Sequence, residues 1–465
     1  MNKSYLILFG FLFIKSFAQT QRHPAEWEPI SAVVMEYHYF EKTKVNLTQI
    51  LDPYLKIANT CIEENVKLYI LNPSKKSLYA YQVNLDSVFK SHGIFSPLIK
   101  FITKDSIDER YPWIRDHGLN FVYQNGISQP IIYNFPEDKS GSFVAKNLHL
   151  KNAIIKPENT HEYYTDGGNF LTDGHGTFNI CATDLTTDLP TEILPKYDYF
   201  YQKFGIKKTV NLRMPFVHVD YFLKLINEET FLVSYIPHVN YDLNLDKFTG
   251  HQSYIDEAVL FLSNNLKSAF NRPFKFIYIQ NAPTSYDTIS NRILHTANAT
   301  YTNALILNKQ VLVPQYQNKS FDSLALATYK KAMPGYKIIG VNCRYYGTFS
   351  GAIHCMTHEI YNSKSIYIKH KWPRNPIKTL KKFYPIKVQI ISNSKNLDVY
   401  LYWRFPKKGF KRLTMKKKND NFYTAYIPIN SKEKTIDYFI EVKTKYYTTK
   451  RPVVAPKNTY HLTFE

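Results

Sequence analysis

The chain has 465 residues, a net charge of +21 and only four cysteines. This length exceeds what one hydrophobic core usually serves, so two domains are expected. The cysteines are too few and too scattered for a disulfide framework or a paired Cys-x-x-Cys metal site. The sequence contains no glycine-rich phosphate loop, which argues against a nucleotide site.

The N-terminal residues have the pattern of a secretion signal. Lys3 precedes an apolar run from Tyr5 to Ile14, and Ser16-Phe17-Ala18 supplies small residues of the kind that a signal peptidase recognises. No later run approaches the roughly 18 apolar residues that a membrane span requires. We therefore expect a signal peptide over residues 1–18 and a soluble protein that is secreted or periplasmic.

Strand–helix–strand units recur through the following residues. The apolar spacing predicts a strand over 31–37, a helix over 47–64 and a strand over 66–71; helices over 254–270 and 322–332 are each followed by a strand, over 274–279 and 337–341. A hairpin over 304–314 turns at Asn308-Lys309. The repetition is too irregular for a solenoid and favours a closed α/β array over a Rossmann sheet. We expect one catalytic domain over 19–370.

The C-terminal part differs in pattern and in charge. Two prolines in 371–377 predict a linker, and five short alternating strands over 386–391, 399–405, 422–429, 436–442 and 460–464 are typical of an immunoglobulin-like β-sandwich over 378–465. From Lys371 onward, 22 Lys and Arg stand against 6 Asp and Glu, which gives +16 of the total +21. Such a domain could contact an anionic surface, or its lysines could be a solvated face. It has no common nucleic-acid motif, so no nucleic acid is expected as a partner.

The segment from Ser350 to Ile360 contains the candidate nucleophile. Cys355 has small residues on its N-terminal side, which leaves room for a substrate to approach a thiolate. The alternative is a buried structural thiol, which is what most free cysteines are.

Three other segments place polar residues where a packed domain ordinarily has few. Asp116 lies beside His117 and before Gly118, and could alternatively be a surface acid paired with Arg115. Residues 165–169, with Gly168 and Asn169, predict a tight turn. Residues 216–220 alternate, so a strand would put His218 and Asp220 on one face with the valines behind them.

Together these residue types define a reaction class. A guanidinium group stays protonated at ordinary pH, and two aspartates can hold its planar fork by paired hydrogen bonds. Its central carbon is a poor electrophile, so the attack requires a strong, soft nucleophile held in line. One histidine can protonate departing ammonia and deprotonate the incoming water. The residues therefore indicate hydrolysis of a guanidinium compound.

Five motifs occur in one order: WIRDHG at 113–118, GGN at 167–169, HVD at 218–220, YTNALILN at 301–308 and GAIHCMTHE at 351–359. With PAEWEP at 24–29, this set resembles the bacterial peptidylarginine deiminases of the Porphyromonas type and their relatives, the agmatine deiminases. The resemblance covers nearly the whole mature chain. It implies the five-bladed α/β propeller of the guanidine-modifying (pentein) superfamily.

The resemblance also implies roles for single residues. Asp116 and Asp220 would clamp the guanidinium, His218 would act as acid and base, Cys355 would form a covalent thiouronium, and Asn303 would orient the reacting groups. It implies no metal and no other cofactor. Within the same motifs we expect Trp113, Arg115, Gly168 and Asn169 to contribute to substrate binding.

The substrate is expected to be an arginine-containing peptide or protein. The export signal, the basic C-terminal domain and Thr357-His358-Glu359 are similar to the secreted peptidylarginine enzymes, whereas agmatine deiminases are usually single-domain and cytoplasmic. Hydrolysis of agmatine or another small guanidine compound is the alternative. An exported binding protein without activity is a second one, which the presence of Cys355 and His218 disfavours.

One segment departs from the exported Porphyromonas enzyme. Where that enzyme has arginines that grip a substrate's C-terminal carboxylate, the matching positions here are Phe135 and Glu137. Glu137 in the pocket would repel a carboxylate and attract an amine, so agmatine or internal arginine would be preferred over C-terminal arginine. Alternatively Glu137 faces solvent and has no effect on substrate choice.

Overall fold

A computed structural model describes residues 21–37, 47–73, 85–104, 113–116, 119–133, 140–150, 153–155, 167–184, 191–193, 202–215, 218–236, 251–288, 290–379, 381–394, 396–419, 421–430 and 433–465. The expected signal peptide lies outside these residues. In the described ranges, no helix combines the length and the apolar character needed to cross a membrane.

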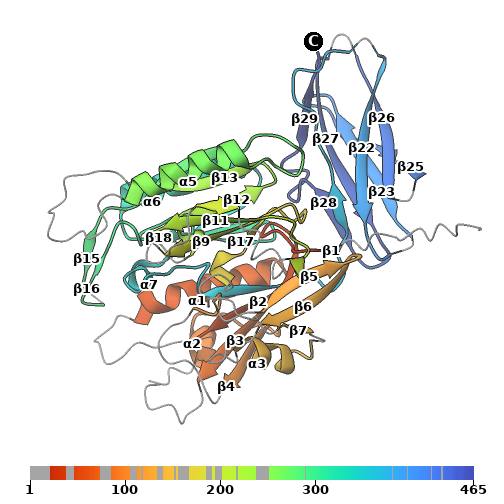
Figure 1. The fold of residues 1–465 in the computed structure, drawn as a ribbon. Helices are drawn as coiled ribbons and strands as arrows, with labels where there is room; N and C mark the ends of the chain where they lie inside the picture. Colours follow the sequence, from red (N-terminus) through yellow and green to blue (C-terminus); the bar gives the residue numbers. More distant parts are fainter. Residues whose placement is uncertain are drawn as a thin grey trace, which may run out of the picture.

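Five small sheets lie among the described residues up to Tyr361 (Figure 1). They comprise β1 (Gln21–Arg22), β5 (Asn120–Gln124), β6 (Ile127–Tyr133) and β7 (Ala153–Ile155); β8 (Leu171–Thr172), β9 (Asn179–Asp184), β10 (Glu192–Ile193) and β11 (Thr209–Met214); β12 (Leu223–Asn227), β13 (Thr230–Tyr235) and β14 (Lys275–Gln280); β17 (Leu305–Leu307), β18 (Gln310–Gln315) and β19 (Lys337–Asn342); and β20 (Thr357–Tyr361), β2 (Ile30–Glu36), β3 (Lys67–Pro73) and β4 (Ile99–Lys104). A separate hairpin joins β15 (Ser285–Asp287) to β16 (Arg292–Leu294). The strands and helices together confirm the expected α/β class.

Each of these sheets repeats one pairing order. An antiparallel pair, such as β5–β6 or β17–β18, is followed by a parallel partner, β7 or β19. The β5–β6 turn has positive φ at Asn125 (52°) and Gly126 (83°), as a two-residue hairpin requires. Parallel partners need a long crossover, and the helices supply several of these.

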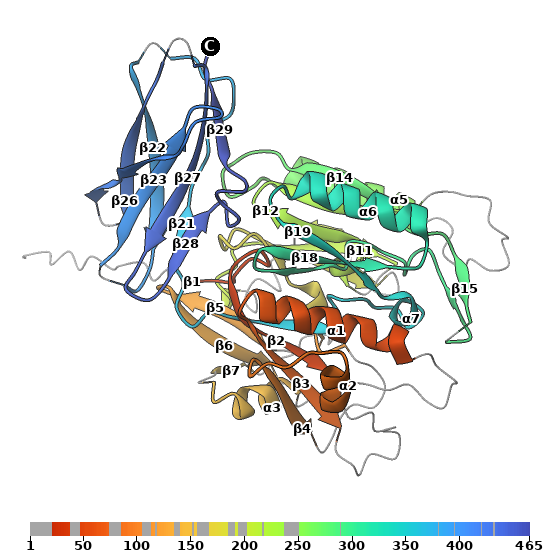
Figure 2. The same cartoon turned by 180° about the vertical axis from the view of Figure 1, so that it is seen from behind.

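The helices are α1 (Leu47–Glu63), α2 (Leu85–Ser91), α3 (Ser140–Asn147), α5 (His251–Asn265), α6 (Lys319–Ala332) and the short α7 (Arg344–Gly347). Helix α1 packs against β3 and β19, α5 against β11 and β13, and α6 against β14, β18 and β19. Figure 2 shows α5 and α6 next to one another. Helix α6 begins earlier than its apolar spacing indicates because Asn318 caps it: the Asn318 side chain accepts a hydrogen bond from the Phe321 amide.

The fifth sheet brings the two ends of this part together. Strand β20 pairs antiparallel with β2, so that His358 lies opposite Val34. The loop around Cys355, which precedes β20, therefore lies close to the N-terminal segment. One continuous hydrophobic core runs from Ala25 to Tyr361.

The C-terminal strands form two antiparallel sheets, coloured blue in Figure 1. One contains β21 (Tyr367–Lys369), β22 (Phe383–Ile391), β26 (Phe422–Pro428) and β25 (Lys416–Asn419); the other contains β24 (Lys411–Thr414), β23 (Asp398–Arg404), β27 (Thr435–Lys443) and β28 (Thr448–Arg451), with β29 (Tyr460–Thr463) on β27. Their inner faces share a second core, from Ile366 to Phe464.

This part departs from the sequence-based expectation in two ways. The chain enters the first sheet at Tyr367, before the expected linker, because β21 pairs with β22. Strands β21, β24, β25 and β28 were not predicted. Strand β25 contains the run Lys416-Lys417-Lys418, whose side chains are all exposed, and an exposed edge strand has no apolar alternation by which to recognise it.

Buried polar contacts join the two parts. The guanidinium of Arg451 on β28 forms an ion pair with Glu228, which lies in the turn between β12 and β13. The ring of Trp372 stacks on Tyr460 at 5.6 Å, and its carbonyl accepts a hydrogen bond from Arg272 at 2.7 Å. Within the expected linker, Trp372 therefore contacts both parts of the chain, whereas Lys371 and Arg374 are exposed.

Candidate active site

The expected site residues share one place in the topology. Asp116, Asn169, Asp220, Asn303 and Cys355 lie two to four residues before β5, β8, β12, β17 and β20, which are strands of five different sheets. Each of these strands then pairs antiparallel with a neighbour. The chain can therefore bring residues that are far apart in sequence to one end of the five sheets.

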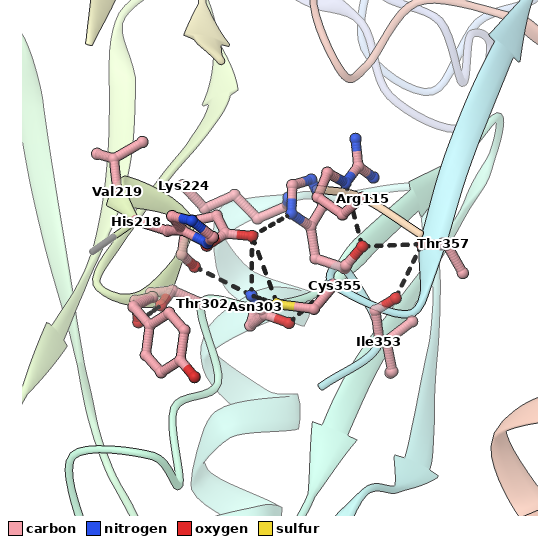
Figure 3. Close-up of polar contacts among 12 residues, drawn as sticks. Arg115, His218, Val219, Lys224, Thr302, Asn303, Ile353, Cys355 and Thr357 are labelled. Carbon is pink, nitrogen blue, oxygen red and sulfur yellow. Dashed lines mark hydrogen bonds and ion pairs between the residues drawn. The ribbon is translucent and has the colours of Figure 1, made fainter. Parts of the chain in front are cut away.

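Cys355 is held at the centre of this cluster and is 2% exposed. Its sulfur accepts a hydrogen bond from Asn303 Nδ2 at 3.2 Å, and its amide donates to Asn303 Oδ1 at 3.3 Å. Figure 3 shows the Asn303 amide beside the sulfur of Cys355. Met356 N–H donates to the Ala352 carbonyl, which fixes the turn that carries the thiol.

Asp220 lies directly beside the thiol. Its Oδ2 is 3.7 Å from the Cys355 sulfur and accepts from Asn303 Nδ2 at 3.1 Å and from His354 Nδ1 at 2.7 Å. The other oxygen, Oδ1, is buried and has no hydrogen-bond partner among the described residues. A buried carboxylate oxygen without a donor is costly in free energy, so this atom is ready to accept from a bound group.

His218 and Asp116 form the more open side of the cluster. His218 Nδ1 is 3.6 Å from Asp116 Oδ1, and the two side chains are 13% and 24% exposed. Since Cys355 and Asp220 are buried behind them, we expect a substrate to enter from this side.

The predicted strand over 216–220 is wrong. Strand β11 ends at Met214, His218 has an extended backbone, and Val219–Tyr221 forms a 3-10 turn, η3. Alternation cannot show where a strand breaks. The turn nevertheless keeps His218 and Asp220 near one another: the charge of His218 is one of the influences on the Asp220 carboxyl.

Burial and charge set the protonation of this pair. Burial, together with the negative charges of Asp220 and Asp116, raises the pKa of the Cys355 thiol well above its usual value, although the Asn303 hydrogen bond opposes this. Burial alone would raise the pKa of Asp220, but the hydrogen bond and charge of His354 outweigh it and lower that pKa. The site therefore holds an ionised carboxylate beside a protonated thiol.

Three residues of this cluster were not predicted: the buried His354 and Lys224, and Glu26, which is 12% exposed. The His354 ring lies between Asp220 and Glu26, with its Nε2 3.4 Å from Glu26 Oε2. Glu26 also forms an ion pair with Lys224. The signal in the sequence was a polar residue inside an apolar stretch, such as Glu26 between Ala25 and Trp27.

The structure places the Arg115 side chain in contact with Glu359 and the nucleophile loop, and its expected contribution to substrate binding stays a prediction. Its guanidinium forms a two-point ion pair with Glu359, at 2.8 and 2.9 Å, and its Nε donates to the His354 carbonyl at 3.1 Å. Burial raises the pKa of Glu359, but Arg115 lowers it to about 2. The Arg115 amide also donates to the Cys355 carbonyl, so Arg115 braces the nucleophile loop.

Three further residues expected to bind substrate, namely Asn169, Gly168 and Trp113, contact other residues of the site. The Asn169 Oδ1 accepts from the amides of Ala182 and Val219, and Val219 lies between His218 and Asp220. A Cβ on Gly168 would lie 2.5 Å from His218 Nδ1, so only glycine allows the ring to sit there. Likewise a Cβ on Gly351 would lie 2.4 Å from the ring of Trp113, which packs on the nucleophile loop.

Phe135 and Glu137, like His117, lie outside the described residues, so their contacts stay predictions. Within the described ranges, no three His, Cys, Asp or Glu side chains gather in a way that could hold a metal ion. The other three cysteines, Cys61, Cys181 and Cys343, are buried and are not in disulfides.

Comparisons with known proteins agree with this geometry. The family model of the Porphyromonas-type peptidyl-arginine deiminases matches residues 22–360. A Legionella pneumophila protein named "Putative agmatine deiminase" is 22% identical over 353 residues, which cover 72% of this chain and 93% of that protein.

Solved structures of low identity have the same fold. An agmatine deiminase from C. jejuni has a TM-score of 0.55 at 21% identity, covering 77% of this chain and 99% of that chain. One from Enterococcus faecalis has a TM-score of 0.56 at 18% identity, covering 74% and 96%. The sequence resemblance is thus confirmed over residues 22–360 and not over nearly the whole mature chain. Because this match covers well over half of the chain, the protein belongs to the Porphyromonas-type peptidyl-arginine deiminase family of hydrolases that act on carbon–nitrogen bonds.

Proposed function

We propose that this protein hydrolyses the guanidinium group of a small guanidine compound, with agmatine as the first candidate, and releases ammonia. The observation that carries the proposal is the buried Asp220 Oδ1, which has no hydrogen-bond partner among the described residues and lies on the carboxylate next to the Cys355 sulfur. A guanidinium N–H is the donor that a charged, water-excluded acceptor favours.

The two aspartates would bind the cation from opposite sides. Asp220 accepts through Oδ1, and Asp116, beside His218, accepts on the more exposed side. The positive charge then offsets the two negative charges that raise the pKa of Cys355. Bound substrate would therefore favour the thiolate, so the nucleophile is activated only when there is something to attack.

The covalent step follows from this arrangement. The Cys355 thiolate attacks the central guanidinium carbon, and Asn303, which donates to the sulfur, holds the thiolate in line. The C–N bond breaks, and His218 protonates the amine that leaves as ammonia. This yields a covalent thiouronium. His218 then takes a proton from water, the resulting hydroxide attacks the same carbon, and the C–S bond breaks to release a ureido product and the thiolate.

Agmatine takes precedence over peptidyl arginine because the Legionella relative and the two solved structures carry agmatine deiminase in their names. Peptidyl arginine, converted to peptidyl citrulline, is the second candidate. It is favoured by the description of the matching family and by the expected signal peptide. On this proposal the five mixed sheets are the blades of a propeller, with the active site at one end.

We further propose an exported protein whose immunoglobulin-like C-terminal part contacts polyanions. Strand β25 exposes Lys416, Lys417 and Lys418. The neighbouring strand β26 exposes Phe422 and Tyr426, at 47% and 53%. A lysine row beside exposed aromatic rings suits an anionic surface with some apolar character.

Ammonia release from four compounds tests the assignment: agmatine, free arginine, an internal-arginine peptide and a C-terminal-arginine peptide. We expect the highest kcat/KM with agmatine, followed by the internal-arginine peptide. Clear preference for either peptide would reverse the order of the two candidates. Absence of ammonia with all four, from protein with a cooperative melting transition, would refute the deiminase proposal for this chain.

A further inference from the structure

Glu26 carries a charge that is only 12% exposed and that the proposed reaction does not use. Its carboxylate forms an ion pair with Lys224 on one side and lies 3.4 Å from His354 Nε2 on the other. The side chains of Lys224 and His354 are each 2% exposed. Burying ions costs solvation free energy that their attraction often fails to recover. Stability alone therefore gives no reason for these charges to be here.

His354 connects Glu26 to the site. Its Nδ1 lies 2.7 Å from Asp220 Oδ2. The backbone holds the ring in place: the His354 amide donates to the Asn303 carbonyl at 3.3 Å, and its own carbonyl accepts from Arg115. His354 Nε2 makes no hydrogen bond among the described residues and faces Glu26 Oε2, so a ring with N–H on both nitrogens would face a carboxylate on each side. Lys224, Glu26, His354 and Asp220 then alternate in sign.

We propose that Glu26 is a positioning residue for guanidinium binding: through His354 it keeps Asp220 ionised and turned so that Oδ1 faces the substrate, while Lys224 balances the charge of Glu26. The inference rests on the proposed function, because Asp220 needs this support only if it binds a cation.

The geometry explains why Asp220 needs such support. His354 and Asn303 both donate to Oδ2, which leaves Oδ1 as the acceptor for substrate. Burial favours the protonated form of Asp220, which cannot hold a cation, and the His354 contact is the largest influence that opposes burial. Titratable or charged groups facing Asp220 are His354, Cys355, His218, Arg115, Tyr221 and Asp116; those facing His354 are Asp220, Glu26, Glu359 and His358.

Glu26→Gln is the first test. The variant should lower kcat/KM for agmatine by about 10- to 100-fold, the range for a hydrogen bond to a charged group. The loss should fall mainly on KM. The acid limb of the kcat/KM profile should move to higher pH, since Asp220 would then bind a proton more readily.

Glu28→Gln is the matched control. Glu28 is two residues away, is buried and forms a two-point ion pair with Arg22, but it does not contact His354. Gln keeps an oxygen for the Ala25 amide, which bonds to Glu28 Oε1 at 2.9 Å. This variant should lose stability and leave the acid limb where it is.

Two substitutions of His354 distinguish the effect of its hydrogen bond to Asp220 from the effect of its charge. Asn can place its side-chain NH2 near the position of Nδ1, so His354→Asn should keep the bond to Asp220 without the charge, whereas His354→Ala loses both. We expect Asn to restore part of the kcat/KM lost in Ala, with the acid limb still shifted. Equal activity and equal limbs in the Asn, Ala and unsubstituted proteins would overturn the inference.

A binding measurement separates this inference from the proposed function. In the Cys355→Ser background, agmatine binding is followed by calorimetry from pH 4 to 8, with and without Glu26→Gln. A higher pH midpoint with Glu26→Gln, and an unchanged one with Glu28→Gln, supports positioning even if no substrate is turned over. Coincident midpoints in all three overturn it, whatever the activity.

Discussion

The nucleophile loop and the outer strands of the C-terminal sandwich differ in the burial and pairing of their charged side chains. Around Cys355, charged side chains are buried or nearly so and each has a partner of opposite sign: Arg115 with Glu359, and Glu26 with Lys224 and His354. On β25 the lysines are exposed and of one sign. The buried charges are fixed in direction and can orient a reaction, whereas the exposed ones are screened and suit contact with a large, variable partner.

The largest effect is expected at the nucleophile. Cys355→Ala should abolish ammonia release, because the thiol beside Asp220 and Asn303 is the proposed nucleophile, and the melting temperature should change little. Cys343→Ala is the control: burial raises the pKa of Cys343 too, yet its loss should cost stability and leave turnover intact. Turnover by folded Cys355→Ala protein would sink the covalent mechanism.

The second effect concerns the contact between the two regions. Glu228→Gln or Arg451→Met should each destabilise the fold by about 3–5 kcal/mol, because the remaining charge is buried without its partner. The double variant should recover much of this loss. Urea unfolding of the single and double variants measures it. A loss in the double variant equal to the sum of the two single losses would show that the pair contributes nothing by itself.

The same contact bears on the domain boundary expected from the sequence. If that boundary separated two independent domains, a chain ending near Trp372 would keep activity on small substrates. It would lack Arg451 while keeping Glu228, and would also cut the C-terminal sheet after β21. We now expect the truncated chain with Glu228 to be less stable than the truncated chain with Glu228→Gln, because the first leaves the Glu228 charge without Arg451. The melting temperatures of the two truncated chains test this.

The third effect is acid lability. Burial favours the neutral forms of His358 and His370, whose pKa values fall to about 3 and about 4. The unfolded chain therefore binds more protons below pH 6.5, and stability declines as the pH drops. Below pH 4.5 the decline steepens, because the folded-state pKa values of Glu228 and Glu359 are about 2, held there by Arg451 and Arg115 against burial.

Each of these two carboxylates contributes on the order of 3 kcal/mol that is present above pH 4.5 and lost by about pH 2. Unfolding free energies measured from pH 7 to pH 3 check the sign. Glu228→Gln should flatten the decline below pH 4.5 without altering the part between 4.5 and 6.5. A curve that is flat from pH 7 to pH 3 would contradict the assignment.

The smallest effect is expected on the exposed lysines. Lys416→Ser with Lys418→Ser should weaken binding to heparin or anionic vesicles by on the order of 1 kcal/mol for each lysine, and raised salt should weaken the unsubstituted protein in the same direction. Lys330→Ser with Lys331→Ser removes the same charge from exposed positions on α6. Equal losses in the two variants would indicate non-specific attraction to net charge.

Apolar periodicity predicted the helices and strands that bury one face in the core. Helices α1, α5 and α6 and the strands between them follow their expected ranges within a few residues, because their buried faces repeat every three to four residues or every second residue. Polar edge strands such as β24 and β25 were missed because no buried face marks them. The break at η3 was missed because alternation continues through it.

The residues of the site also fall into two groups, those that a local motif identifies and those that only the fold brings together. Cys355, Asp220, Asn303, Asp116 and His218 are identified by their motifs, and the structure brings them together. The support behind them depends on contacts across the fold. Glu26 and Lys224 are 198 residues apart, and no local pattern links them. No local pattern links Arg115 to its partner Glu359 either, which lies 244 residues away.

Arg115 also fastens two loops to one another. Its amide bonds to the Cys355 carbonyl and its Nε to the His354 carbonyl, so the turn at 113–116 and the nucleophile loop must open together. Hydrogen exchange at the Arg115 amide should therefore occur only through the opening that also exposes Cys355. A covalent modifier of the Cys355 sulfur that keeps the nucleophile loop closed would therefore slow amide hydrogen exchange at residues 113–116. The modified residue lies 240 residues further along the chain than Arg115.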